Sequence, residues 1–209
     1  IDSMLDLLVS ALNFFAIRKS QAAPDAKFNF GYAKLEALAA MFEGVLIVGA
    51  GAFILYESVR KLQTEQAPVD TAFSLYTMTL SVAVTGLLVA YLSRVARRTR
   101  NLIVRADALH YKSDLFSNLA VIASLILVEF TGFAAIDAVF GIVISGYIAV
   151  SAINLMKESV GVLLDRALDP EITAQIEEII RSRSQIASYH GLATRKSANI
   201  CYVAVHLIS

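Results

Sequence analysis

The sequence is short of charge. Only 17% of its 209 residues are charged, whereas 57% are hydrophobic, and the mean hydropathy is +0.64. A soluble globular domain carries charge on about a quarter of its residues. The composition therefore excludes an ordinary soluble domain and indicates a protein embedded in a lipid bilayer.

Disulfides, an excess of one charge and some common motifs are missing as well. The one cysteine, Cys201, has no internal partner, and its apolar neighbours predict a buried strand residue with a structural role. The 18 basic and 18 acidic residues cancel, so the total charge does not point to nucleic acid. The sequence opens with no secretory signal and contains no HExxH motif.

Apolar runs dominate what is present. Five runs are long enough, or nearly so, to form transmembrane helices of about 20 residues. They lie near 1–18, 34–60, 74–95, 107–130 and 136–164. The chain begins inside the first run and stops inside an alternating run, so we expect further elements on both sides, among them one more helix before the first run.

Basic residues between the runs predict the orientation. Arg18, Lys19 and Lys27 follow the first run, and a group of arginines from Arg94 to Arg105 follows the third. Because Lys and Arg accumulate on the cytoplasmic side of a membrane, both segments are expected there. The C-terminal tail is then cytoplasmic too, and the arginines need no further ligand to explain them.

A soluble pattern replaces the apolar runs near Asp169. A helix start with proline at its first helical position is followed by apolar residues at helical spacing. Two alternating runs, near 187–195 and 200–208, then predict strands. We therefore expect an all-α membrane domain over residues 1–166 and the first part of a small cytosolic α+β domain over residues 167–209.

Two pairs of ionisable residues interrupt the apolar runs. Asp2 and Asp6 stand four residues apart, as do His110 and Asp114. Residues at i and i+4 share one face of a helix, so two such helices packed face to face would gather three carboxylates and one imidazole. Four N/O ligands suit a borderline divalent ion such as zinc, whose charge offsets the cost of aspartates in hydrocarbon. We predict a metal site within the membrane.

Each of these residues also has a structural explanation. A carboxylate near a helix end can cap it or reach the interface, and a histidine on an apolar helix is usually a satisfied core residue. Two pairs at one spacing favour the metal site over four coincidences. Asn118, one turn beyond Asp114, is predicted to hydrogen-bond that carboxylate. Close helix packing is predicted at Gly44, Gly49, Gly51, Gly141 and Gly146.

Four motifs stand at distant places in the chain: 2–6 (DSMLD), 30–36 (FGYAKLE), 105–114 (RADALHYKSD) and 163–167 (LLDRA). In this order they resemble the second helix, the start of the third helix, the fifth helix and the junction to the cytosolic domain in the cation diffusion facilitator family. The similarity is closest to its bacterial zinc and iron efflux branch and covers essentially the whole chain.

The resemblance implies a proton-coupled antiporter that works as a homodimer in the bacterial inner membrane. It implies six helices per protomer, the first of them before Ile1, and a ferredoxin-like cytosolic domain. It also implies that Asp2, Asp6, His110 and Asp114 form the transport site. Imidazole and carboxylates bind protons as well as metal, so the two can compete for one site.

Further features follow from the resemblance with alternatives left open. Lys34 and Asp165 stand where the family has a salt bridge that interlocks two protomers at the cytoplasmic surface; otherwise each is a solvated charge at a helix end. His190 and His206 stand where the family has ligands of a cytosolic zinc site, but the residues around His190 depart from the usual motif, so both can equally be ordinary strand residues.

The family's second metal site, in the loop after its second helix, is largely absent. Asp25 remains, but Phe28 and Tyr32 stand where histidines are common in the efflux branch. We therefore expect no metal in that loop.

The most economical function is export of Zn²⁺, or of Fe²⁺ or Cd²⁺, in exchange for H⁺ by a transporter that is not an enzyme. The imidazole favours zinc, whereas an all-oxygen site would favour manganese. An intramembrane metalloenzyme would need a catalytic base near the ligands, and the sequence offers none. A metal-sensing membrane regulator, which binds metal without moving it, stays open because only a flux measurement excludes it.

Overall fold

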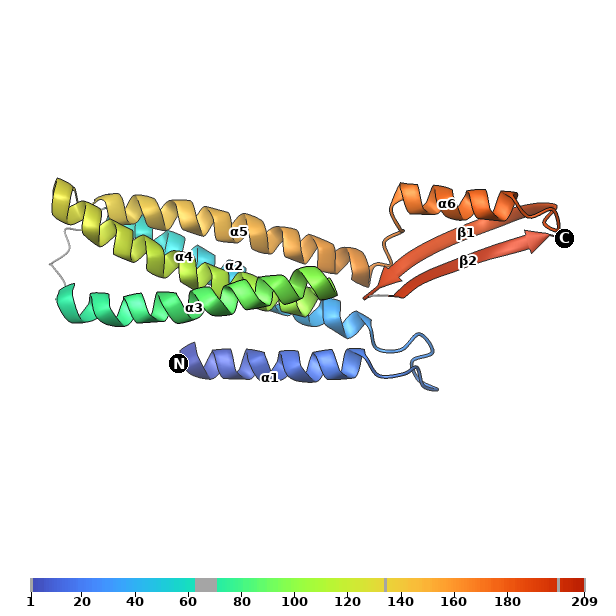
Figure 1. Cartoon of the computed structure of the whole chain (residues 1–209), viewed down its shortest axis with the longest axis horizontal. Helices are drawn as coiled ribbons and strands as arrows, with labels where there is room; N and C mark the ends of the chain where they lie inside the picture. Colours follow the sequence, from blue (N-terminus) through green and yellow to red (C-terminus); the bar gives the residue numbers. More distant parts are fainter. Residues whose placement is uncertain (1, 63–70, 134, 199, 209) are drawn as a thin grey trace. The chain divides into compact units, whose positions relative to one another are not determined.

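The computed structural model describes residues 2–62, 71–133, 135–198 and 200–208, and the side chains of 4, 6–62, 78–133, 135–198 and 200–208 (Figure 1). Five long helices come first, followed by a short helix and two strands, in the predicted order. Their bounds are α1 Asp2–Ser20, α2 Lys34–Lys61, α3 Thr71–Thr99, α4 Leu102–Thr131, α5 Ala135–Leu163, α6 Pro170–Arg181, β1 Ser188–Ser197 and β2 Ile200–Ile208.

The chain divides into two compact units. One consists of Ile1–Leu38 with Glu158–Ser209, and the other of Ala39–Lys157. The first unit holds α1, the junction after α5 and the small α+β part. The second unit holds most of α2 and α5 together with all of α3 and α4.

Within the described part of the chain, four helices are long and apolar enough to cross a membrane: α2, α4, α5 and the part of α3 from Met78 to Thr99. Exposed apolar side chains such as Leu87 and Phe130 lie on these helices, where a bilayer would cover them. The fold therefore contains four of the five predicted spans by length and composition. The fifth predicted span corresponds to α1, whose first side chains lie largely outside the described residues, so its role as a span stays a prediction.

An antiparallel contact between α2 and α5, here called the α2–α5 seam, organises the second unit. A Cβ atom added to Gly44 would lie 2.6 Å from Met156 Cγ, and one added to Gly51 would lie 3.3 Å from Ile148 Cγ2. Gly44, Gly51 and Ser58 are seven residues apart, a spacing that keeps small residues on one line facing the partner helix. The two helix backbones therefore approach closely.

The other end of the seam is closed by polar contacts. A Cβ atom on Gly141 would lie 3.0 Å from Ser58 Cβ, so the small residues match there too. Lys61 Nζ lies 2.8 Å from Asp137 Oδ2, and the Ser124 hydroxyl donates to Asp137 Oδ1 at 2.8 Å. Asp137 thus joins the ends of α2, α4 and α5.

A small apolar core lies between these polar ends. Ile47, Ile148 and Ala152 are at most 2% exposed, and Leu109 of α4 packs against them. The apolar core at the α2–α5 seam is therefore also in contact with the segment of α4 that directly precedes His110.

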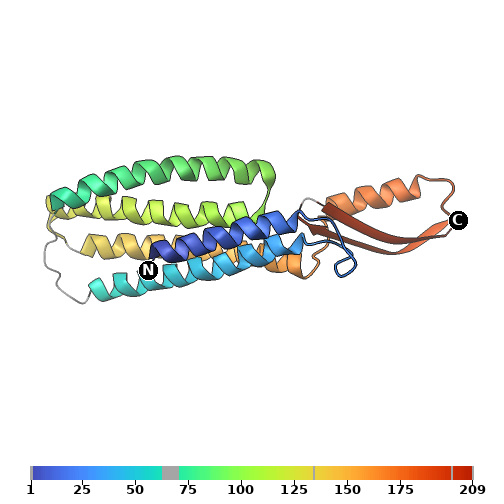
Figure 2. The same ribbon diagram turned by 90° about the horizontal axis from the view of Figure 1, so that it is seen from below.

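A tight connection joins α3 to α4, which lie side by side (Figure 2). Only Arg100 and Asn101 separate the helices. Asn101 Oδ1 accepts a hydrogen bond from Val104 N at 3.1 Å, which caps the first turn of α4. Both helices are longer than the predicted apolar runs, because the polar residues that flank each run continue the helical hydrogen bonding of the backbone. Exposed apolar residues follow one face of α3: Leu80, Val84, Leu87 and Tyr91.

The α+β part contains one antiparallel hairpin with α6 packed along β1 (Figure 1). The register is interrupted by a bulge between His190 and Ala193, where Gly191 adopts φ 66°. A positive φ is accessible to glycine at little cost, so the glycine permits the bulge.

Three sequence-based expectations need correction. Gly49 and Gly146 meet nothing within 4 Å, because they lie off the line of close contact, unlike the other three glycines. Cys201 lies in a strand as predicted but is exposed, and α6 packs against β1, the other strand of the hairpin. Asp169 occupies the N-cap of α6, but its side chain makes no capping hydrogen bond.

The seam predicts opposite outcomes for matched glycine substitutions. Gly44→Ala should destabilise the protein by about 1 to 3 kcal/mol, because the new methyl group overlaps Met156. Gly49→Ala should leave stability unchanged or slightly higher, because its methyl group meets open space and alanine favours a helix. Thermal unfolding midpoints in detergent measure both, and an equal response of the two variants would contradict the seam.

Candidate metal-transport site

One half of the predicted membrane site lies on α4. The Asn101 cap fixes the start of this helix, which places His110 in its third turn and Asp114 one turn later. His110 Nε2 lies 3.6 Å from Asp114 Oδ2. Their side chains are 32% and 53% exposed, so both remain accessible to an ion. The imidazole and the carboxylate therefore face one point, as the i,i+4 spacing predicts.

The other half lies on α1. Asp2 and Asp6 are both helical and one turn apart, and Asp6 is exposed. The side chain of Asp2 lies outside the described residues. Because this pair belongs to the first compact unit and the α4 pair to the second, the joining of the two pairs into one site stays a prediction. Within the described residues, no group of three or more His, Cys, Asp or Glu side chains is gathered for a metal.

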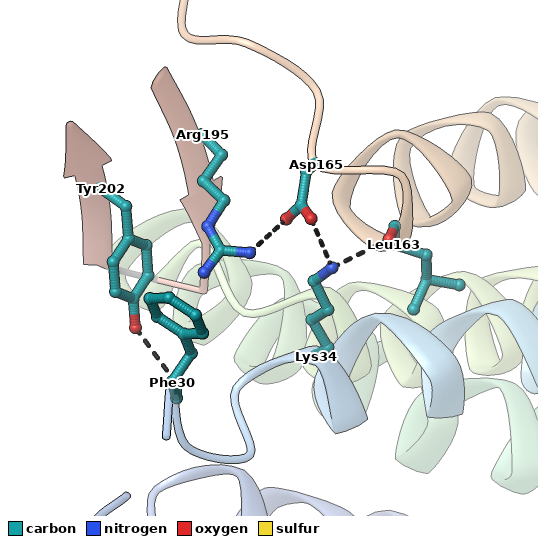
Figure 3. A network of polar contacts seen from close by, with 6 residues as sticks. All are labelled: Phe30, Lys34, Leu163, Asp165, Arg195 and Tyr202. Atoms are coloured by element: carbon teal, nitrogen blue, oxygen red, sulfur yellow. Dashed lines mark hydrogen bonds and ion pairs between the residues drawn. The ribbon is translucent and has the colours of Figure 1, made fainter. Parts of the chain in front are cut away.

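The predicted contact between Lys34 and Asp165 is present. Lys34 Nζ lies 2.9 Å from Asp165 Oδ2, and it also donates to the Leu163 carbonyl at 3.0 Å (Figure 3). The start of α2 is thereby tied to the end of α5 within one chain. Whether this pair also orders two protomers stays a prediction.

A second cation completes this contact, and sequence reasoning missed it. Arg195 Nη1 lies 2.9 Å from Asp165 Oδ1, and its guanidinium stands 4.3 Å from the ring centre of Phe30 and 4.8 Å from that of Tyr202 (Figure 3). The Tyr202 hydroxyl also donates to the Phe30 carbonyl at 3.2 Å. Arg195 therefore links the hairpin to the junction through charge and cation–π contacts.

The hydrogen bond from Lys34, with that from Arg195, holds the pKa of Asp165 below its ordinary value of 3.8. The carboxylate is therefore charged throughout the physiological range and keeps both cations bound.

The two histidines of the hairpin stand opposite each other. His190 and His206 are register partners, and their rings stack at 11° with centres 5.2 Å apart. Both residues are exposed. A Cβ atom on Gly191 would lie 3.2 Å from His206 Cδ2, so the glycine at the bulge leaves room for this ring. The two imidazoles thus lie side by side on one face of the hairpin. Whether they hold metal stays a prediction.

The loop carboxylate Asp25 organises its own loop. Its Oδ1 accepts hydrogen bonds from the backbone N–H groups of Lys27 and Phe28, both at 2.9 Å, and Tyr32 donates to its Oδ2 at 2.5 Å. The hydrogen bond from Tyr32, with those from the backbone, lowers the pKa of Asp25. The phenol that replaces a histidine here uses the carboxylate as a structural acceptor. Asn118 is half-buried one turn beyond Asp114, and its role stays a prediction.

The junction predicts a pH-dependent effect of Asp165→Asn. The substitution should lower the thermal midpoint at pH 7, because the amide leaves both Lys34 and Arg195 without a counter-charge. The lowered pKa means that the carboxylate contributes fully above about pH 4 and that its contribution is lost as the pH falls through the folded-state value. Unfolding curves of parent and variant should therefore converge below pH 4, and a constant difference down to pH 2 would contradict the ion pairs.

Comparison with known proteins agrees with this architecture. The family description "Cation efflux transmembrane domain" matches residues 1–164, and "Cation efflux protein, cytoplasmic domain" matches residues 168–209. Similar relatives include the cation-efflux pump FieF of Yersinia pestis (strain Pestoides F) and of Yersinia pseudotuberculosis serotype O:3 (strain YPIII). Each is 34% identical over 207 residues, which cover 99% of this chain and 69% of the relative.

These matches cover the helices, the junction and the hairpin alike. They agree with the four membrane-capable helices and with the small domain that follows them. The matched descriptions are those of membrane proteins for cation efflux. The chain therefore belongs to the cation diffusion facilitator family of cation efflux proteins.

Proposed function

We propose that this protein exports a divalent metal cation from the cytoplasm and binds it in the membrane through Asp2, Asp6, His110 and Asp114. The observation that supports the proposal most directly is the juxtaposition of His110 and Asp114, 3.6 Å apart on a membrane-capable helix of a cation efflux protein. Charged residues at such a depth are costly unless they serve an ion.

Zinc is the proposed substrate. Three carboxylates and one imidazole form a four-ligand N/O set of the kind that tetrahedral zinc accepts. Fe²⁺ and Cd²⁺ are alternative cargoes, because geometry and availability decide among such ions more than ligand type does.

Protons are the proposed counter-ion. The imidazole and the carboxylates must lose protons to bind metal, so a pH difference across the membrane can bias release. Alternating access then requires the helices to rock so that the site faces each side in turn. Asn118 is proposed to orient the Asp114 carboxylate within the site.

The proposed setting is a homodimer in the bacterial inner membrane with the C-terminal domain in the cytoplasm. The basic residues before α2 and those around the connection from α3 to α4 support this orientation. The contact between Lys34 and Asp165 is then close to the membrane surface, where it is proposed to hold two protomers in register.

A metal-sensing regulator that does not transport is the second candidate. The stacked pair of His190 and His206 favours it, because two imidazoles on one face of the hairpin suit a zinc ion that reports the cytosolic metal level. The same pair is compatible with a transporter whose cytosolic domain responds to zinc.

Asp114→Ala should abolish metal flux, because it removes one ligand and the carboxylate next to His110. Zinc uptake into proteoliposomes, with and without an imposed pH gradient, measures this. Asp169→Ala is the matched control, since Asp169 is exposed and its side chain makes no capping bond. Unchanged flux in Asp114→Ala would reject the site, and absence of flux in the parent protein would favour the regulator.

His190→Ala and His206→Ala should each weaken zinc binding to the cytosolic domain at least tenfold, because either change leaves a single imidazole. Zinc titration in an Asp114→Ala background isolates this site. Unaltered affinity in both variants would show that the stacked histidines are ordinary strand residues.

A further inference from the structure

A pocket of about 370 Å³, here called the junction pocket, lies where the ends of α1, α2 and α5 meet the hairpin. All of its walls belong to the first compact unit. Most of the lining is apolar, and it includes Phe28, Phe30, Leu35, Leu38 and Leu163. The volume falls within the range of about 300 to 1,000 Å³ that small-molecule sites occupy. The pocket can therefore hold part of a ligand that has an apolar segment.

Three cations line the same pocket: Lys19, Lys34 and Arg195. Lys34 and Arg195 share one carboxylate, that of Asp165 (Figure 3). Among the described residues Lys19 forms no ion pair; it is exposed, and its Nζ lies 4.0 Å from the ring centre of Tyr32. The junction pocket therefore has a cation to offer to an anionic ligand.

A second carboxylate near the pocket does not remove this positive charge. Asp25 attracts Lys19 from beyond ion-pair distance, but it does not line the pocket. Its oxygens already accept hydrogen bonds from Tyr32 and from two backbone N–H groups of the loop. The three cations of the pocket exceed Asp25 and Asp165 by one charge.

The depth of the pocket in the membrane indicates the kind of ligand. Leu35 and Leu38 belong to the first turns of α2, which is apolar enough to span a bilayer. Lys19 lies in the last turn of α1, and Lys34 is the first residue of α2. The apolar wall therefore begins at the edge of the hydrocarbon, and the cations lie at the level of the headgroups. A lipid with an anionic headgroup matches both levels.

The aromatic rings disfavour a zwitterionic lipid. An open aromatic face would attract the ammonium group of a choline headgroup. Here the Arg195 guanidinium lies 4.3 Å from the ring centre of Phe30 and 4.8 Å from that of Tyr202 (Figure 3), and Lys19 lies over Tyr32. Because these three rings already hold cations, a further ammonium group would meet like charge, whereas an anionic headgroup would not.

We propose that the junction pocket binds an anionic phospholipid, with its phosphate beside Lys19 and one acyl chain along Leu35 and Leu38. The proposed orientation of the protein makes this a lipid of the cytoplasmic leaflet. Charge-assisted hydrogen bonds from lysine to the phosphate hold the headgroup, and the bound lipid stabilises the junction by mass action. The site is separate from the proposed metal site and needs no metal.

The chain contains no tryptophan, so Phe28→Trp places a single fluorophore in the pocket. Brominated phosphatidylglycerol or brominated phosphatidylcholine is added to this variant in detergent, without zinc, and the quenching of fluorescence is measured. Half-maximal quenching should need about fivefold less of the anionic lipid, which is the effect of one basic residue on its binding. Phe130→Trp, on an exposed position of α4, should be quenched equally by both lipids.

Substitutions of two lysines test the position of the headgroup. Lys19→Gln in the Phe28→Trp background should remove most of the preference for the anionic lipid, and Lys19→Arg should keep it. Lys27→Gln is the matched control and should also keep it, since Lys27 is exposed in the loop after α1 and does not line the pocket. Glycerol phosphate, which has no acyl chain, should not compete with the lipid.

Four results would overturn the inference. Equal quenching of the pocket fluorophore by both lipids would show no selection of charge. Equal effects of Lys19→Gln and Lys27→Gln would assign the preference to the total charge of the loop. Competition by glycerol phosphate would assign the pocket to a soluble anion, and quenching that decreases as dimers form would show that a second protomer covers it. Because zinc is absent, each of these results leaves the proposed function standing.

Discussion

The close antiparallel packing of α2 against α5 is the constraint on which the membrane part depends. Small residues seven positions apart let two backbones meet, and the apolar core between them receives Leu109 of α4. Without the hydrophobic effect to hold helices together in a bilayer, such contacts and the polar link at Asp137 carry much of the association. The position of His110 and Asp114 is therefore set by a contact in which neither takes part.

The helices and strands were largely predictable because hydropathy and alternation are local signals. The pairing of His190 with His206 was open to sequence reasoning for the same reason, since two alternating runs joined by a short turn form a hairpin. The N-terminal half of the transport site was harder to judge. Asp2 and Asp6 can be placed on one helix face from spacing alone, but their distance from His110 depends on how two separate units are arranged.

The features that the sequence did not predict depend on residues that are distant in the chain. The glycines of α2 look alike in the sequence, yet Gly44 and Gly51 meet α5 and Gly49 does not, because only the partner helix decides which face is the seam. Arg195 was missed because its place between Phe30 and Tyr202 depends on the hairpin register and on the bulge at Gly191.

The short link between α3 and α4 has a mechanical consequence. With two residues between them and contact along their length, these helices behave as one stiff hairpin. Lipid chains would cover the exposed apolar face of α3, and α4, which carries His110 and Asp114, packs against α3. Lateral pressure and bilayer thickness therefore act on α4 through α3. The surrounding lipid then influences the tilt of the helix that holds His110 and Asp114.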